Sequence, residues 1–431
     1  MEGVRVLYVA TRYELFGINL DELESKWERY RPAAKANAKA SSAYKTPPLV
    51  VHVDFYERGL PVSMAVFRSP ISHSTLYFVG GEIHLQDPRK FSSGPGFSTL
   101  RMSSEIYEFQ PNPMHFGEVR LVGELVSPNP SPIVETFDVG GGDDQNSSRT
   151  FVLGPRFGFD YDDCPPPYVE LLSFSSSLSV SSEATDYGPF LRSYAGRRRN
   201  GYRGVLEHFV LGRRMFVFFY SGYGDRSPFA CFDAAEGGYG EWLSYRDISR
   251  ITRSWDSCPV PISGGRSVFV PGVDDNDVHV ANTWRGYNVL LFYDTREFGI
   301  TLCAGIMTES GILLRYQDIT DKIFKDFKVR DCLFTPTCCI IDGGGGRVYA
   351  LACGIDGTNG SLSPCDRNSI LCISEFNITK LSVADYIVSE GLAGDFPATG
   401  DDFVGISSLK TYVCRSFHKK EVHKIRDAFV V

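Results

Sequence analysis

Several short apolar stretches of this 431-residue chain are preceded or entered by an ionisable side chain. Histidine can give or take a proton near neutral pH, a carboxylate can assist it, and arginine can bind an anionic group. If the stretches are strands that converge on one centre, residues far apart in the sequence would meet there. The residues concerned are Arg68, His73, Glu135, Asp138, Glu207, His208, Asp274, Asp275, His279 and Asp342.

Three of these residues could do acid–base chemistry, in which a histidine moves a proton with the help of a carboxylate: His73, Glu207 and His208. Three others could bind a ligand, with the arginine facing an anionic group: Arg68, Asp138 and His279. The alternative is structural. Arginine and histidine can satisfy backbone carbonyls, and acidic residues are common in solvated turns such as the one predicted around Asp274 and Asp275.

The common signatures of enzymes and metal sites are absent from the sequence. It contains no GxxxxGK(S/T) phosphate-binding loop, no HExxH or CxxC pattern and no GxSxG nucleophile motif. The four glycines at 343–346 lie between two apolar stretches and favour a hairpin turn. Adjacent Cys338 and Cys339 lack the spacing of zinc ligands. We therefore expect no cofactor and no metal.

The charge balance and the termini limit the compartment and the partners. The chain carries 44 Lys and Arg against 52 Asp and Glu, a net charge of −8, without long blocks of either sign, which argues against a nucleic-acid partner. The first residues lack the pattern of a secretory signal, and no apolar run reaches about 18 residues, so we expect no membrane span. Eleven irregularly spaced cysteines favour reduced thiols. We expect a cytoplasmic or nuclear protein.

The elements that would position the ionisable residues are short strands. Runs of β-branched and aromatic residues alternate with glycine, proline and serine clusters, and no long helical periodicity occurs. Residues 243–248 and 314–319 are identical at four of six positions. Such self-similarity is typical of repeats, and strand-rich repeats favour a β-propeller of four-stranded blades. Within a single domain, we place the units at about 1–31 plus 400–431, 49–112, 118–182, 187–249, 255–320 and 328–380.

One stretch is better preserved than the others. Arg68 and His73 precede the apolar run Leu76–Val79, which ends on Gly80 and Gly81, and a second apolar run follows at 105–109. This order resembles one repeat of the kelch family, in which an inner strand with Arg and His is followed by an apolar strand, a double glycine and a further hydrophobic strand.

The resemblance implies the architecture of the whole chain. It implies an all-β, kelch-like β-propeller of about six four-stranded blades, although seven remain possible. It also implies a ring that is closed by pairing N-terminal strands with a C-terminal strand, which we expect at residues 406–417.

A kelch-like ring suits two different functions. As in most members of that family, loops on one face could bind a protein partner, and this is the function that we favour. Alternatively, polar residues in the central funnel could make the protein an enzyme or a small-ligand binder, with acid–base or lyase/specifier-type chemistry. The ExxxDxxxH iron motif of plant specifier proteins is absent. A catalytic site would require the funnel side chains to meet beside one cavity.

Overall fold

The part of the chain that the structure describes is built almost entirely of β-strands. The helices α1 (Leu20–Ser25) and α5 (Thr320–Ile323) are short. This computed structural model describes residues 5–25, 50–72, 74–84, 99–112, 115–139, 148–154, 168–175, 179–184, 205–219, 229–234, 240–243, 264–270, 287–295, 299–307, 313–324, 333–344, 346–356, 369–381, 404–417 and 425–431. The all-β prediction is confirmed.

The first three groups of strands are four-stranded antiparallel meanders. The first contains β26 (Asp427–Val430), β1 (Val6–Ala10), β2 (Glu14–Asn19) and β3 (Val50–Asp54). The second contains β4 (Ala65–Arg68), β5 (Leu76–Val79), β8 (Glu105–Asn112) and β9 (His115–Glu124). The third contains β10 (Ile133–Asp138), β11 (Ser148–Gly154), β12 (Tyr168–Phe174) and β13 (Val180–Ala184).

Three further meanders follow in the described part of the chain. The fourth contains β14 (Val205–Leu211), β15 (Arg214–Phe219), β16 (Phe229–Asp233) and β17 (Glu241–Trp242). The fifth contains β18 (Gly264–Val270), β19 (Tyr287–Asp294), β20 (Thr301–Met307) and β21 (Leu313–Asp318). The sixth contains β22 (Leu333–Gly344), β23 (Arg347–Asp356), β24 (Ser369–Leu381) and β25 (Val404–Phe417).

Short parallel pairings join some of the meanders. Val180 of β13 pairs with Gly123 of β9, which links the second and third meanders into one eight-stranded sheet. Val210 of β14 pairs with Arg266 of β18, which links the fourth and fifth meanders in the same way. Strands β6 (Glu82–His84) and β7 (Thr99–Met102) form a separate two-stranded sheet within the second meander.

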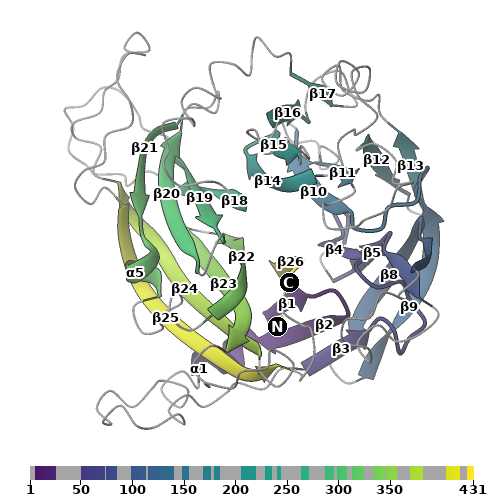
Figure 1. Ribbon diagram of the computed structural model, residues 1–431, viewed down its shortest axis with the longest axis horizontal. Helices are drawn as coiled ribbons and strands as arrows, with labels where there is room; N and C mark the ends of the chain where they lie inside the picture. Colours follow the sequence, from purple (N-terminus) through teal and green to yellow (C-terminus); the bar gives the residue numbers. More distant parts are fainter. Residues whose placement is uncertain are drawn as a thin grey trace.

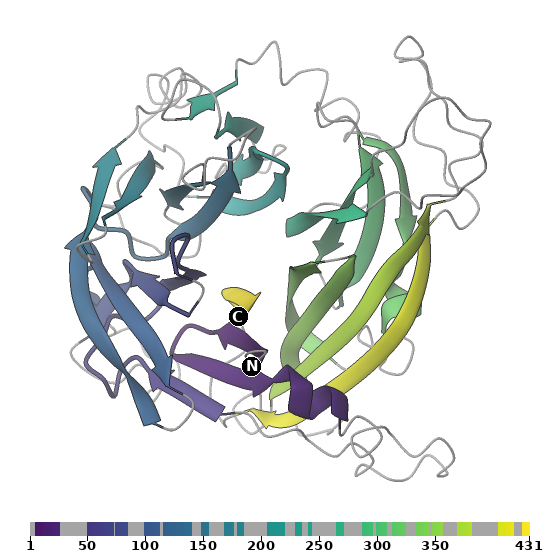
Figure 2. The same ribbon diagram turned by 180° about the vertical axis from the view of Figure 1, so that it is seen from behind.

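The meanders follow one another around a common centre (Figure 1), and the same circular order is visible from behind (Figure 2). The first strand of each meander, β26, β4, β10, β14, β18 or β22, lies nearest the centre. Because a meander has four strands, the chain leaves it at the end of the ring at which it came in. We call the end where these inner strands begin the N-terminal face, and the opposite end the C-terminal face. This circular order is compatible with the propeller-like prediction.

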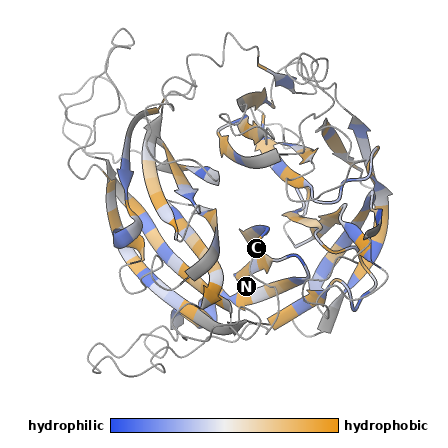
Figure 3. Cartoon of the chain, in the orientation of Figure 1, coloured by the Kyte–Doolittle hydropathy of each residue, from blue (hydrophilic) through white to orange (hydrophobic). Residues whose placement is uncertain are grey.

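The hydrophobic core lies between neighbouring meanders. Each sheet is covered on both sides, so its strands carry continuous apolar runs, as in β5, where all four residues are buried. Figure 3 shows apolar residues along the strands of the ring. Representative pairs from six core clusters, in ring order, are Tyr8 and Phe78, Val79 and Val152, Phe151 and Phe232, Phe216 and Phe292, Leu291 and Ala350, and Leu351 and Leu7.

A C-terminal strand completes the first meander, but it is not the predicted one. β26 pairs with β1, and Asp427 Oδ2 accepts a hydrogen bond of 3.1 Å from Val66 N of β4. The expected closing segment, 406–417, belongs to β25 and pairs with β24 as the outer strand of the sixth meander. The prediction was wrong because 404–417 is long and strongly β-patterned, whereas β26 has only four residues.

Two predicted unit boundaries are also shifted. β3 pairs with β2 in the first meander, although residues 50–54 were assigned to the second unit. β9 pairs with β8 in the second meander, although residues 118–124 were assigned to the third. In each case the sequence pattern identified a strand, but pairing between strands decides which meander receives it.

The double glycine after β5 forms the sharp turn that its sequence predicts. Gly80 and Gly81 have φ angles of 67° and 100°, in a region that favours glycine. A Cβ on Gly81 would lie 2.5 Å from Val62 O, and a Cβ on Gly80 would lie 2.4 Å from Asn129 O. The turn therefore needs glycine for both its backbone angle and its close packing, and it leads directly into Glu82.

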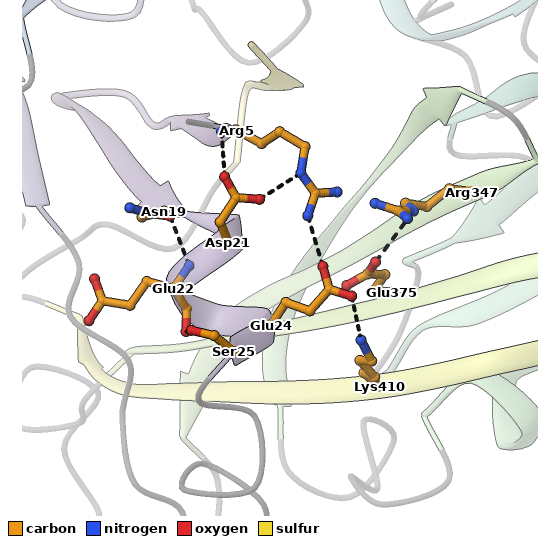
Figure 4. Close-up of polar contacts among 9 residues, drawn as sticks. All are labelled: Arg5, Asn19, Asp21, Glu22, Glu24, Ser25, Arg347, Glu375 and Lys410. Carbon is orange, nitrogen blue, oxygen red and sulfur yellow. Dashed lines mark hydrogen bonds and ion pairs between the residues drawn. The ribbon is translucent and has the colours of Figure 1, made fainter. Parts of the chain in front are cut away.

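An ionic network links α1 of the first meander to the sixth (Figure 4). Arg5 forms ion pairs of 2.8 Å with Asp21 and with Glu24, and Lys410 of β25 lies 3.0 Å from the second oxygen of Glu24. These side chains are 28–44% exposed, so solvent screening limits their contribution to stability. The network supplements the apolar contact between the first and last meanders.

Two general features concern the described residues only. No helix among them is long and apolar enough to cross a membrane. Five cysteines with described side chains are buried: Cys231, Cys303, Cys338, Cys353 and Cys372.

Candidate functional site

Three ionisable side chains from three inner strands meet near the centre of the ring. Glu135 Oε1 lies 2.9 Å from His208 Nε2, and Glu135 Oε2 accepts a hydrogen bond of 2.9 Å from Arg266 Nη1. Glu135 is on β10, His208 on β14 and Arg266 on β18. The ion pair between Glu135 and Arg266 thus connects the third meander to the fifth. We call these three residues the axial cluster.

The charges of the axial cluster stabilise one another. Burial alone would raise the pKa of Glu135, but Arg266 and His208 outweigh this effect and hold the pKa at about 2. In return, the negative charge of Glu135 raises the pKa of Arg266. The Glu135 side chain is only 11% exposed, so screening by water is weak. Glu135 is therefore ionised at neutral pH and paired through both oxygens.

Among the described side chains to which we assigned roles, that of His208 contacts another candidate residue, Glu135. Arg68 ends β4; its Nε is buried without a hydrogen-bond partner in the described part of the chain, and burial lowers its pKa. Asp138 ends β10 and is exposed. Glu207 is on β14 beside Phe218 of β15, but its side chain lies outside the described residues.

Of the remaining predicted residues, the structure describes Asp342 but not the others. Asp342 is exposed and accepts a hydrogen bond of 2.8 Å from Gly344 N, as expected of a turn residue. The others lie outside the described residues: His73, Asp274, Asp275 and His279.

Cavities and possible metal ligands among the described residues bear on what the axial cluster can do. A cavity of about 410 Å³ lies elsewhere, between the outer strands β9 and β13, and is lined by residues that include Leu121, Gly123 and Ser179. Within the described residues, no group of three or more His, Cys, Asp and Glu side chains could hold a metal ion. Arg266 would also repel a cation from Glu135. The geometry of the cluster joins three inner strands.

A second cluster has the same residue types and was missed by the sequence interpretation. Glu82 Oε2 lies 3.3 Å from Arg12 Nη2 and 3.0 Å from His84 Nε2. The side chains of Glu82 and His84 are 1% and 5% exposed, whereas that of Arg12 is 34% exposed. We call these residues the rim cluster, because Arg12 lies in the turn between β1 and β2, at the N-terminal face.

A sequence signal for the rim cluster did exist. Glu82 directly follows Gly80 and Gly81, and glycine allows the backbone to turn tightly and approach a neighbouring segment. In the structure, Val62 and Glu82 form an isolated β-bridge. A carboxylate immediately after such a turn is therefore a candidate for burial, whereas Arg68 and His73 were chosen because they precede the strand.

Comparisons with known proteins add little to this geometry. No family model matches the chain, and no curated protein matches it. A similar solved structure is the GH32 β-fructofuranosidase BmSUC1 of Bombyx mori, with a TM-score of 0.30 and 12% identity over 83% of this chain and 66% of that chain. The chain thus spans slightly less than two thirds of that neighbour, and a similarity this weak supports no argument about activity.

Proposed function

We propose that the six described meanders are the blades of a closed, kelch-like β-propeller. Support comes from the core clusters, each of which lies between successive meanders, including one between the sixth and the first. The described strands form six four-stranded groups, which favours six blades over seven. The positive φ angles of Gly80 and Gly81 are compatible with the double-glycine turn on which the kelch resemblance depends.

This ring is a binding module that recognises a protein partner through loops on its C-terminal face. The observation that carries this proposal is the turn between β4 and β5, of which the structure describes residues 69–72, 74 and 75. Ser69 Oγ accepts hydrogen bonds of 3.2 and 3.0 Å from the backbone N–H groups of Ile71 and Ser72, and Ser69 N donates to Thr75 O at 2.9 Å. Ile71 is nevertheless 57% exposed. A turn that is already ordered loses little entropy when its apolar side chain is bound.

The axial cluster favours this function over catalysis in the funnel. Both carboxylate oxygens of Glu135 are paired, and none of the three residues has a buried polar atom without a partner. A group that must act on a substrate would be expected to keep some bonding capacity for it. The cluster therefore serves to hold β10, β14 and β18 together.

The chemistry of the whole surface defines the expected partner further. A net charge of −8 disfavours the phosphate backbone of nucleic acids. The partner that we propose is a protein, and the compartment that we propose is the cytoplasm or the nucleus. An enzyme or small-ligand function in the funnel is the alternative.

The test compares two exposed aliphatic residues on opposite faces of the ring. Val126, in the connection between β9 and β10 at the N-terminal face, is 58% exposed and is the matched control for Ile71. Wild type, Ile71→Asp and Val126→Asp are immobilised and incubated with extract from the native source, and bound proteins are quantified by mass spectrometry. We expect a protein that wild type and Val126→Asp retain and that Ile71→Asp retains about tenfold less.

Melting temperatures establish that all three chains are folded. If wild type retains no protein above the bare matrix, or if Ile71→Asp retains the same proteins as Val126→Asp, the C-terminal face is not the binding surface.

A further inference from the structure

Buried polar atoms without a partner gather around the rim cluster. Among the described residues, Arg12 Nε, Ser63 Oγ and Glu82 Oε1 are buried and make no hydrogen bond. Native proteins pair the great majority of their buried polar atoms, so an unpaired buried atom calls for an explanation. The side chains of Glu82 and Ser63 are almost completely buried, at 1% and 0% exposure.

The three atoms belong to segments that contact one another directly. Ser63 N donates a hydrogen bond of 2.7 Å to Arg12 O, and Arg12 Nη2 lies 3.3 Å from Glu82 Oε2. Val62, adjacent to Ser63, forms the β-bridge with Glu82. Because Nε and Nη2 share one guanidinium, and Oε1 and Oε2 share one carboxylate, the unpaired atoms of Arg12 and Glu82 flank the same ion pair.

Ser63 adds backbone strain at the same place. It has a φ angle of 62°, and Ser408 is the other non-glycine residue with a positive φ among those that the structure describes. A left-handed conformation is unfavourable for serine and is often retained where a ligand is held. The strained residue, the ion pair and the unpaired atoms therefore coincide at the N-terminal face.

The axial cluster provides an internal comparison, because it has the same three residue types. Glu135 uses one oxygen for His208 and the other for Arg266. Glu82 instead uses Oε2 for both His84 and Arg12, which leaves Oε1 buried and unpaired. A purely structural triad would be expected to use both oxygens, as the axial cluster does. In the rim cluster, Glu82 Oε1 therefore remains a hydrogen-bond acceptor without a partner.

We propose that the rim cluster binds a small neutral polyol, meaning a molecule with hydroxyl groups on adjacent carbons. Arg12 and Glu82 offset each other's charge, so a charged ligand would meet one unfavourable partner. The unpaired atoms are an acceptor on Glu82, a donor on Arg12 and a hydroxyl on Ser63, and hydroxyl groups of a ligand can both donate and accept. The ligand approaches along Arg12, which is the exposed member of the cluster. This site is independent of the protein-binding proposal, because Ile71 lies at the opposite face.

The test uses three probes of equal length that differ in charge: sorbitol, gluconate and 1-amino-1-deoxysorbitol. Binding to the full chain at neutral pH is measured by saturation-transfer-difference NMR. We expect saturable binding of sorbitol and at least about fivefold weaker binding of the anion and the cation. Glu82→Gln should weaken sorbitol binding by about tenfold or more, because a hydrogen bond to a charged acceptor is lost.

Two further variants complete the experiment. Glu375→Gln removes another largely buried carboxylate, on β24, and should leave sorbitol binding unchanged. Arg12→Lys keeps the positive charge but removes the Nε–H donor; it should weaken binding as well, and it serves if Glu82→Gln does not fold. The proposal is overturned if sorbitol does not bind wild type saturably, if the charged probes bind as tightly, or if folded Glu82→Gln or Arg12→Lys binds like wild type.

Discussion

At the scale of single residues, two buried carboxylates with similar neighbours have different consequences. Glu135 is paired through both oxygens, and Arg266 and His208 keep its pKa at about 2. Glu82 is paired through one oxygen only. The difference is one of geometry, since both residues are surrounded by an arginine and a histidine. Glu135 should therefore contribute mainly to stability, and Glu82 mainly to binding.

The contribution of Glu135 should depend on pH in a definite direction. A carboxyl group whose pKa is lower in the folded state than its ordinary value, about 4.3, stabilises the fold above that value. This stability is lost as the pH falls from about 5 towards 2. We expect Glu135→Gln to lower the free energy of unfolding by about 2–4 kcal/mol at pH 7, and the gap to wild type should shrink towards pH 2.

Chemical denaturation at several pH values measures both effects. Asp138→Asn is the matched control, because Asp138 is on the same strand but exposed; it should change stability by less than about 0.5 kcal/mol. A gap between Glu135→Gln and wild type that stays constant from pH 7 to pH 2.5 would contradict the assigned role of the ion pair.

At the scale of elements, the turn after β5 decides where Glu82 lies. Gly80 and Gly81 have positive φ angles and pack against the backbone oxygens of Asn129 and Val62. The turn therefore fixes two neighbouring segments, the one that precedes β4 and the one that precedes β10. The two glycines thus position segments that are distant from them in the sequence.

Substitution of Gly81 should cost more than the backbone angle alone. Gly59 has a φ of 70° with no atom within 4 Å of an added Cβ, whereas a Cβ on Gly81 would lie 2.5 Å from Val62 O. We expect Gly59→Ala to destabilise by about 1 kcal/mol, from the left-handed conformation alone. Gly81→Ala should destabilise by about 2 kcal/mol more, because backbone must move.

Urea denaturation of both variants gives the comparison, with m-values to show that unfolding remains two-state. Equal losses for Gly59→Ala and Gly81→Ala would mean that the contact with Val62 O is easily relieved, and that the turn does not fix the neighbouring segment.

At the scale of the whole molecule, the four residues of β26 connect distant parts of the chain. Ala428 and Val430 pack against the cluster shared with the sixth meander, and Phe429 packs against the cluster shared with the second. Phe429 also stacks on Tyr8, with ring centroids 5.8 Å apart. The strand therefore closes the ring through apolar contacts on both of its sides.

Removal of residues 425–431 should open the ring. We expect a truncated chain with a broad, weakly cooperative thermal transition, because the inner strand of the first meander is lost and two core clusters are exposed. Lys410→Ala, which removes only a partly exposed ion pair with Glu24, should shift stability by less than about 1 kcal/mol. Calorimetry distinguishes the two variants. A truncated chain that melts as sharply as wild type would exclude a closing role for β26.

Much of the fold follows from local pattern. The apolar run of β5 and the double glycine after it predicted a buried strand and a sharp turn, and both are present. The candidate sites were predicted less well. The structure pairs His208 with Glu135, a candidate to which no role was assigned, and pairs Arg266 with the other oxygen of Glu135. Arg266 was overlooked, because no local pattern indicates which strands will face each other.

The sequence by itself determined that this protein is all-β, where most of its strands lie and where glycine turns interrupt them. These properties depend on neighbouring residues, which constrain one another through backbone sterics and side-chain alternation. Only the tertiary structure decided that β26 rather than 406–417 completes the first meander, and that Glu135 meets Arg266 while Glu82 keeps one oxygen unpaired. Those outcomes depend on contacts between residues more than a hundred positions apart, or on which of two oxygens faces a neighbour, and neither is encoded in a local pattern.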